Sequence, residues 1–193
     1  MNIMNTYTGR QFDPMQITED DVCLEDIAHA LSLLSRGGGQ LIWFYSVGQH
    51  SVNCAREASA RGWNDRMVLA CLLHDASEAY ISDIIRPVKI YLDNYLAIEN
   101  KIMKVILKKF GLGDMTPEEN EKWKQIDNDI LTHELQALLP GERNRLTAPL
   151  ASVPDLQERP WQETEKNFLK MARQYLKKTA PDSRRRSEGI AGS

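Results

Sequence analysis

The stretch from Leu72 to Glu78 places ionisable side chains at the end of an apolar run. It reads Leu-Leu-His-Asp-Ala-Ser-Glu and contains His74, Asp75 and Glu78. Burying such a group without a partner costs several kcal/mol, so these side chains need a solvent-filled cleft, a partner or a metal. His74 and Glu78 are four residues apart, and Asp75 and Glu78 are three apart. That spacing puts them near one side of a helix and predicts a functional site there.

A further carboxylate lies within an apolar stripe later in the chain. We expect a helix from Glu118 to about Leu139, in which apolar residues recur at spacings of three and four. Asp127 and Glu134 fall within this stripe, whereas Asp129 falls on the opposite face. Because an aspartate in a buried stripe is unusual, the pattern favours Asp127 over Asp129 as the functional carboxylate. The apolar members of the stripe are Trp123, Ile126, Ile130, Leu131, Leu135 and Leu138.

His50 is the third candidate, in the first turns of another expected helix. Its neighbour Cys54, four residues on, points the same way, toward the core. Together with His74, Asp75 and Asp127, His50 completes a set of two imidazoles and two carboxylates. This mixed nitrogen and oxygen set suits one divalent transition metal ion, namely Mn, Fe, Co, Ni or Zn. Four protein ligands leave positions for a water and a phosphate oxygen, and the metal would activate the water and polarise the phosphorus.

Each of these features also has an ordinary structural explanation. A histidine in an apolar helix is usually a hydrogen-bonded core residue, and an aspartate in a stripe can simply pair with an arginine. A single His-Asp pair is a weak signal. Three such anomalies on three expected helices favour a site.

The rest of the sequence predicts an all-α fold of about six or more helices in one domain, residues 1–178. The helices are expected over residues 25–35, 46–61, 65–80, 90–110, 116–139 and 161–177, with residues 143–159 mostly loop. No segment alternates β-branched and polar residues, so no substantial sheet is expected. Residues 179–193, which include Arg184, Arg185 and Arg186, are expected to form a disordered tail.

Composition narrows the functional classes. The 193 residues carry a formal net charge of −3, which argues against a general nucleic-acid binder. No apolar run approaches the roughly 18 residues that span a bilayer, and the N-terminus lacks the features of a signal peptide. The cysteines, Cys23, Cys54 and Cys71, are odd in number and widely spaced. We expect buried free thiols in a cytoplasmic protein, and no cysteine-ligated zinc site.

The pattern of His50, His74-Asp75 and Asp127 resembles the HD-domain superfamily of metal-dependent phosphohydrolases. The run from His74 to Glu78, followed by Asp83 and by Pro87-Val88-Lys89, resembles its compact branch, typified by bacterial 5'-deoxynucleotidases. Further stretches are similar to small HD hydrolases of bacteria and phages, including phage dATP triphosphohydrolases. These stretches are residues 7–10, 27–31, 36–38 and 45–47, and the resemblance covers roughly residues 6–177.

The resemblance implies a role for each matched position. His50, His74, Asp75 and Asp127 would be the metal ligands. Glu78 would orient or deprotonate the attacking water, and Asp83 would lie near the substrate. Arg36 lies near the phosphate-binding arginine of the family, across a loop of variable length. Lys89 and Lys124 are candidate phosphate contacts or solvated surface charges. Lys124 precedes Asp127 by one helical turn, which would aim it toward the metal.

The remaining histidines and Glu134 bear on the metal count. A two-metal site needs further histidine ligands, and only His29 and His133 remain. His133 lies on the polar face of its helix, and His29 either supports the loop that carries Arg36 or packs in the core. We therefore expect one metal ion, with Glu134 as the partner of an arginine rather than a ligand.

The leading hypothesis is hydrolysis of a phosphate of a deoxynucleotide, either a dNMP or a dNTP. One alternative is a non-catalytic nucleotide-binding or regulatory HD module, which the full set of ligands with Glu78 and Asp83 disfavours. Another is a cyclic-nucleotide phosphodiesterase, which the histidine count disfavours. The expected partner is a small nucleotide substrate, with no nucleic acid and no membrane. A homo-oligomer is expected by analogy with similar proteins.

Overall fold

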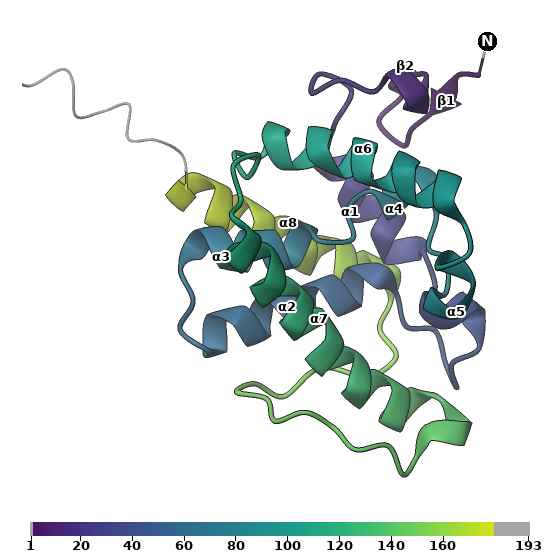
Figure 1. The fold of residues 1–193 in the computed structure, drawn as a ribbon, viewed down its shortest axis with the longest axis vertical. Helices are drawn as coiled ribbons and strands as arrows, with labels where there is room; N and C mark the ends of the chain where they lie inside the picture. The colour runs from purple at the N-terminus through teal and green to yellow at the C-terminus, as the bar shows by residue number, and fades with distance from the viewer. Residues whose placement is uncertain (1, 180–193) are drawn as a thin grey trace, which may run out of the picture.

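Helices form almost all of the regular structure in the computed structural model, which describes residues 2–179 (Figure 1). In chain order they are α1 (Leu24–Leu33), α2 (Val47–Ala60), α3 (Asp65–Leu73), α4 (Glu78–Ile81), α5 (Arg86–Lys89), α6 (Asp93–Lys109), α7 (Pro117–Leu138) and α8 (Trp161–Thr179). Single 3-10 turns lie at Pro14–Gln16, Arg36–Gly39 and Pro140–Glu142. The predicted all-α class is confirmed.

A short antiparallel pair near the N-terminus makes up the sheet of the described residues. Strands β1 (Met4–Asn5) and β2 (Gln11–Phe12) pair with Met4 opposite Phe12. This agrees with the expectation of no substantial sheet. The tail predicted from residue 179 lies outside the described residues, except that Thr179 is the last residue of α8. No helix of the described chain is long and apolar enough to cross a bilayer.

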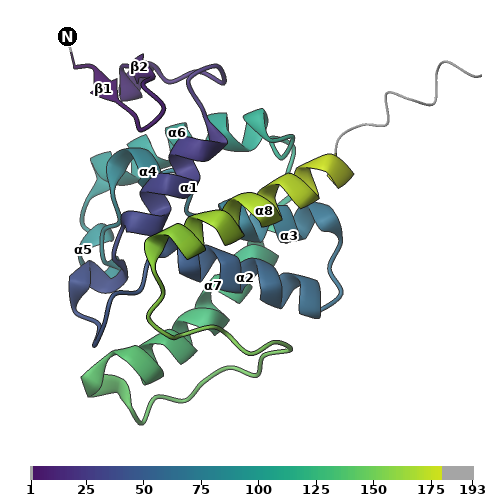
Figure 2. The ribbon, with the colours of Figure 1, turned by 180° about the vertical axis from the view of Figure 1, so that it is seen from behind.

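The core is built around α3, which packs against α2, α7 and α8. Every residue from Met67 to Leu73 is buried, as its unbroken apolar run predicts. α8 runs across the back of α1, α2 and α3 (Figure 2). α7 packs on the opposite side of α2 and α3, so the N-terminal half of α2 and the end of α3 meet α7 in the interior.

Local signals account well for the ends of α2 and α7. The Ser46 side chain accepts from the backbone N–H of Gln49 at 3.1 Å and caps α2. Thr116 and Glu119 form a capping box at the start of α7, with Pro117 at the first position. Both helices begin within one residue of the predicted start, so the side chains that they carry have the predicted phase.

The predicted single helix over residues 65–80 is wrong. α3 ends at Leu73, and α4 begins only at Glu78. In between, the N–H of Ala76 donates to the carbonyl of Leu73 and the N–H of Glu78 donates to that of Asp75. Each bond joins residues three apart and closes a tight turn of four residues. The predicted helix over residues 90–110 begins instead at Asp93, after the separate turn α5.

The glycines after α1 shape the loop that carries Arg36. Gly37 and Gly38 have φ of 63° and 61°, in the left-handed region that glycine adopts without strain. The loop closes back on the start of α2, because the N–H of Arg36 donates to the carbonyl of Tyr45 at 2.9 Å. This closure brings the Arg36 side chain next to the first turn of α2.

The long segment between α7 and α8 is tied to α2 by polar side chains. Buried Glu57 accepts from the backbone N–H groups of Ala151 and Ser152, both at 2.8 Å. Asn53 donates to the carbonyl of Asp155 at 2.9 Å. The segment has no helix from residue 143 to residue 160, as predicted.

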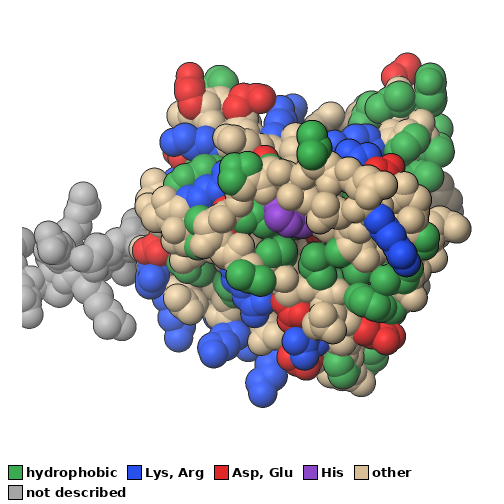
Figure 3. All heavy atoms as spheres, turned by 90° about the horizontal axis from the view of Figure 1, so that it is seen from below, with side chains coloured by type: hydrophobic (Ala, Val, Ile, Leu, Met, Phe, Trp, Pro, Cys, Tyr) green, Lys and Arg blue, Asp and Glu red, His purple; other side chains and the backbone are tan. Residues whose placement is uncertain are grey.

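On the face seen in Figure 3, acidic, basic and hydrophobic side chains are interspersed. A nucleic-acid-binding surface usually carries a continuous basic stripe. This face therefore has no feature of that kind.

Candidate metal centre

His50 is held with its Nε2 atom facing the interior of the molecule. It lies in the first turn of α2 and is fully buried. Its Nδ1 lies 2.6 Å from Oε1 of Glu134, which is also buried. A carboxylate at this distance accepts a hydrogen bond from Nδ1–H, which leaves Nε2 as the nitrogen that can bind a metal ion. Such a bond orients metal-ligating histidines in many proteins.

His74 is oriented in the same manner from the other side. It caps the C-terminus of α3, and its Nδ1 lies 2.8 Å from the carbonyl oxygen of Cys71. Nδ1–H therefore donates to that carbonyl, and Nε2 is again the nitrogen that can bind a metal ion. The Nε2 atoms of His50 and His74 lie 3.2 Å apart. Two imidazole nitrogens that face each other at this distance favour a cation, either a proton or a metal ion, between them.

The two predicted aspartates complete this arrangement. Oδ2 of Asp75 lies 3.1 Å from Nε2 of His74 and 3.8 Å from Nε2 of His50. Oδ1 of Asp127 lies 3.1 Å from Nε2 of His50 and 3.8 Å from Nε2 of His74. Neighbouring ligands of an ion with bonds of about 2.1 Å lie about 3.0 to 3.4 Å apart. The structure thus brings all four predicted ligand residues together, and we call them the HHDD cluster.

Opposite charges within the HHDD cluster set its protonation. Burial alone would raise the pKa of Asp75 and of Asp127, but the histidines beside them hold both pKa values below the usual range. Burial would lower the pKa of His74, yet Asp75 and Asp127 raise it well above the ordinary value. A site that attracts positive charge so strongly is suited to a divalent cation.

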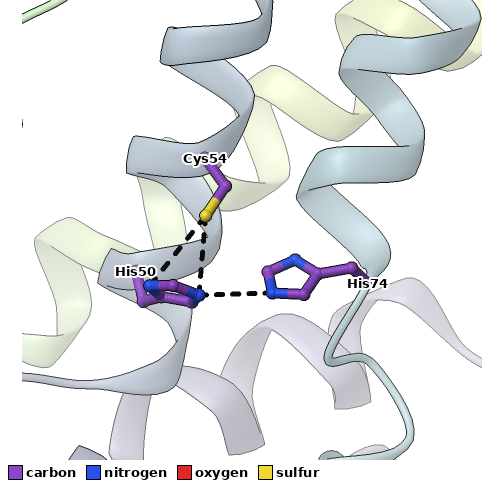
Figure 4. Close-up of side chains that lie close together, drawn as sticks. All are labelled: His50, Cys54 and His74. Atoms are coloured by element: carbon purple, nitrogen blue, oxygen red, sulfur yellow. Dashed lines mark hydrogen bonds between the residues drawn. The ribbon is translucent and has the colours of Figure 1, made fainter. Parts of the chain in front are cut away.

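Cys54 adds a sulfur to this region that the sequence did not single out as a donor. His50, Cys54 and His74 are all buried, and one ligand atom from each lies within 4.8 Å of the others (Figure 4). Sγ of Cys54 lies 3.5 Å from Nε2 and 3.9 Å from Nδ1 of His50. The group could hold a metal ion. Burial, together with nearby Asp127 and Glu134, raises the pKa of the thiol well above its usual value, so the carboxylates are the better donors.

Glu78 lies in the first turn of α4 and is 3% exposed. Its Oε1 lies 3.4 Å from Nζ of Lys89, and its Oε2 has no hydrogen-bond partner within the described residues. Burial, and then the carboxylates of Asp75 and Asp83, raise the pKa of Glu78 to about 9. Buried carboxylates with unpaired oxygens and raised pKa values are typical of groups that take part in proton transfer.

Asp83 and Lys89 lie near Glu78, and their contacts with a substrate stay predictions. Asp83 follows Ser82, whose φ of 70° turns the chain between α4 and α5. Burial raises the pKa of Asp83, and Arg36, Asp75 and Lys89 are among the charges that act on it. Lys89 bonds Glu99 at 2.5 Å as well as Glu78. Both residues therefore belong to the surroundings of the cluster.

Arg36 and Glu134 form a buried layer behind the cluster. Nη1 of Arg36 lies 3.4 Å from Oδ2 of Asp75, and its Nε lies 3.2 Å from Oε2 of Glu134. Tyr45 donates to Oε1 of Glu134 at 2.7 Å. Burial alone would raise the pKa of Glu134, but Arg36 and His50 lower it to about 2. The predicted pairing of Glu134 with an arginine is confirmed.

Several other predicted or considered residues lie elsewhere. Lys124 is half exposed and pairs with Glu121 at 2.9 Å rather than with the cluster. Asp129 pairs with Arg61 at 2.8 Å on the opposite side of α7, so the choice of Asp127 over Asp129 agrees with the structure.

The two remaining histidines lie outside the cluster as well. His133 bonds the carbonyl of Ala148 at 2.7 Å. His29 bonds Glu165 at 3.2 Å and stacks on Tyr7. It does not support the loop of Arg36, which was one of its two expected roles. In the described chain, therefore, neither histidine can extend the cluster to a second metal.

Sequence reasoning missed Arg86, the first residue of α5. Its Nη2 donates to Oδ2 of Asp127 at 3.1 Å, and its Nη1 donates to Oδ1 of Asn128 at 2.8 Å. Its place beside Pro87, within the stretch that carries the family resemblance, was the available signal. Its contact with α7 depends on tertiary structure, which no local pattern contains.

Comparison with known proteins finds two similar bacterial proteins, both described as uncharacterized. Over 112 residues the chain is 39% identical to the uncharacterized protein YfdR of Escherichia coli K12, covering 58% of this chain and 60% of that protein. Over 116 residues it is 36% identical to an uncharacterized protein of Rhodobacter capsulatus, covering 57% of this chain and 59% of that protein. The chain thus spans about three fifths of the length of these relatives. No family model matches it.

Proposed function

We propose that this chain is a metal-dependent phosphohydrolase of the HD-domain superfamily that acts on deoxynucleotides. The observation that carries the proposal is the convergence of His50, His74, Asp75 and Asp127. The two Nε2 atoms lie 3.2 Å apart, and each lies 3.1 to 3.8 Å from one oxygen of each aspartate. These residues come from three separate parts of the chain. Two imidazoles and two carboxylates fit one divalent ion such as Mn, Fe, Co, Ni or Zn.

The chemistry follows from the groups that surround the cluster. A divalent ion held by the four side chains would lower the pKa of a water and polarise a phosphate. The positive charge of a bound ion would favour the ionised form of Glu78. The carboxylate would then accept the proton of the attacking water at Oε2, the oxygen that has no other partner. Asp83 would lie beside the bound substrate. Arg36 and Lys89 would offset the negative charge of the phosphate.

The outer layer would fix the metal ligands in place. Glu134 bonds His50, and Arg36 bonds both Glu134 and Asp75. Outer partners of this kind orient metal-ligating side chains and raise metal affinity. Since His29 and His133 are engaged elsewhere, the proposal is for one ion per chain.

We also propose that the protein works in the cytoplasm. Cys23, Cys54 and Cys71 are all free thiols. Unpaired cysteines are typical of reducing compartments.

The test is an assay of the purified protein against dNMPs, dNTPs and cyclic nucleotides, with Mn²⁺, Co²⁺ or Zn²⁺. We expect phosphate release from a dNMP or dNTP that stops in chelator. Glu78→Ala should keep the fold and the metal and lose about 10²–10⁴-fold in turnover. Glu121→Ala, at a carboxylate that is 75% exposed, is the matched control and should leave turnover unchanged.

Four results would contradict the proposal. Turnover in chelator would show that catalysis does not require a metal ion. Preferred cleavage of cyclic nucleotides would point to a phosphodiesterase, and nucleotide binding without turnover would point to a regulatory module. Loss of the metal from Glu78→Ala would show that Glu78 is itself a ligand.

A further inference from the structure

Arg86 lies on the outer side of Asp127, one carboxylate away from the centre of the cluster. Oδ1 of Asp127 faces Nε2 of His50 at 3.1 Å, and Oδ2 of the same carboxylate accepts from Arg86 at 3.1 Å. The other donor of the guanidinium, Nη1, bonds the amide oxygen of Asn128. Arg86 therefore bridges α5 to α7 beside the cluster.

The two arginines at the cluster differ in how firmly they are held. Arg36 has a side chain that is 14% exposed and pairs with two carboxylates, those of Asp75 and Glu134. Arg86 has a side chain that is 59% exposed and pairs with one carboxylate and one neutral amide. An incoming anion can replace an amide oxygen without leaving a buried charge unpaired. Of the two arginines, Arg86 is the one that is free to bind a ligand from solvent.

The α5 turn presents its cations to the site. Arg86 and Lys89 are three residues apart and lie near one face. They contact Asp127 and Glu78 respectively. The apolar side chains of Ile85 and Val88, by contrast, are 40% and 46% exposed. Positive charge on α5 is thus directed at Asp127 of the cluster and at Glu78 beside it.

We infer that Arg86 is a substrate-binding residue that contacts the phosphate adjacent to the one held at the HHDD cluster. The inference rests on the proposed function and narrows its substrate class to nucleoside di- and triphosphates over monophosphates. Arg36 and Lys89, whose side chains are 14% and 21% exposed and therefore lie deeper than that of Arg86, serve the first phosphate. The planar fork of Arg86 matches two oxygens of a second phosphoryl group.

The test is calorimetric titration of the full-length protein with inorganic tripolyphosphate and with orthophosphate, each with Mn²⁺ in excess over the ligand. Arg86→Ala should weaken tripolyphosphate binding about ten- to a hundredfold, the usual effect of losing hydrogen bonds to a charged group. Orthophosphate binding should change by less than about threefold. Arg86→Lys should recover part of the affinity, because it keeps the charge but not the fork.

Arg173→Ala is the matched control. Arg173 on α8 is 56% exposed and pairs with Glu25 at 2.8 Å, so its removal also takes a half-exposed arginine from a carboxylate. It should change neither affinity. The inference is overturned if Arg86→Ala behaves like this control, if it weakens both ligands equally, or if it loses the metal. If tripolyphosphate binds through Arg86 but no nucleotide is hydrolysed, the proposed function fails and this binding site stands.

Discussion

Replacing Glu78 by glutamine should stabilise the metal-free protein, and the gain should grow as the pH rises. The side chain is 4% exposed, and burial with the nearby carboxylates raises its pKa to about 9. In the unfolded chain the same group has its ordinary pKa of 4.5. Between these two values the native state holds a proton that the unfolded state has released. Stability is therefore fully present below the unfolded pKa and falls as the pH rises toward the folded pKa.

The magnitude follows from the two pKa values. At pH 5 the unfolded state gains less than about 1 kcal/mol by ionising Glu78, and at pH 8 it gains about 5 kcal/mol. The native state gains almost nothing over the same range, because its group is still protonated. The wild-type protein should thus lose about 4 kcal/mol relative to Glu78→Gln between pH 5 and pH 8. Glutamine keeps the shape and does not ionise.

The assay is urea unfolding of both proteins in chelator at pH 5, 6, 7 and 8. The difference between the free energies of unfolding of the two proteins is then compared across pH. Groups that titrate alike in both proteins contribute nothing to this difference. Glu121→Gln removes the same charge from an exposed position and should show a flat difference within about 0.5 kcal/mol. A flat difference for Glu78→Gln as well would refute the claim that burial raises this pKa. Saturating Mn²⁺ should shrink the difference, since a nearby cation favours the carboxylate.

Three further predictions concern the ligands and their supports. Asp127→Ala should abolish binding of the single metal equivalent per chain while Asp129→Ala retains it, as metal analysis by mass spectrometry would show; two equivalents in the wild type would contradict the one-ion site. Glu134→Gln should weaken metal affinity about 10- to 100-fold, because the bond that orients His50 loses its charge, and a competition titration with a chelator measures this. Glu57→Gln should cost about 2–4 kcal/mol in urea unfolding without changing the metal content, because it removes the buried charge that holds the segment after α7; unchanged stability would show that this anchor is dispensable.

The placement of the cluster could be predicted where local signals determine a helix and its phase. The Ser46 cap sets the start of α2, so His50 falls in its first turn. The capping box sets the start of α7, and the apolar stripe then fixes which residues face inward. Asp127 lies 3.1 Å from His50, whereas Asp129 pairs with Arg61 on the other side. The amphipathic pattern was sufficient to predict which side chains point inward, because the apolar face of each helix must pack against the core.

The break between α3 and α4 could not be predicted, because nothing local ends the helix. Residues such as Ala76 and Glu78 are good helix formers, and no glycine or proline interrupts the run. The turn instead places His74 and Asp75 beside side chains from α2 and α7. Helix propensity depends on neighbouring residues, so it does not reveal a break that is stabilised by contacts with residues distant in sequence. The same holds for Arg86, whose partner Asp127 lies 41 residues later in the chain.

Lys124 shows where position along a helix is a poor guide. It precedes Asp127 by one turn, and that spacing suggested a common direction. At about 100° per residue, however, three residues leave the two side chains about 60° apart around the axis. The difference places Lys124 farther from the buried side that contains Ile126 and Ile130. Its long side chain then meets the nearest carboxylate on the surface, that of Glu121, one turn earlier. For a flexible cation at the edge of a stripe, the neighbouring surface charge decides the contact, and only side chains within the stripe are directed by the core.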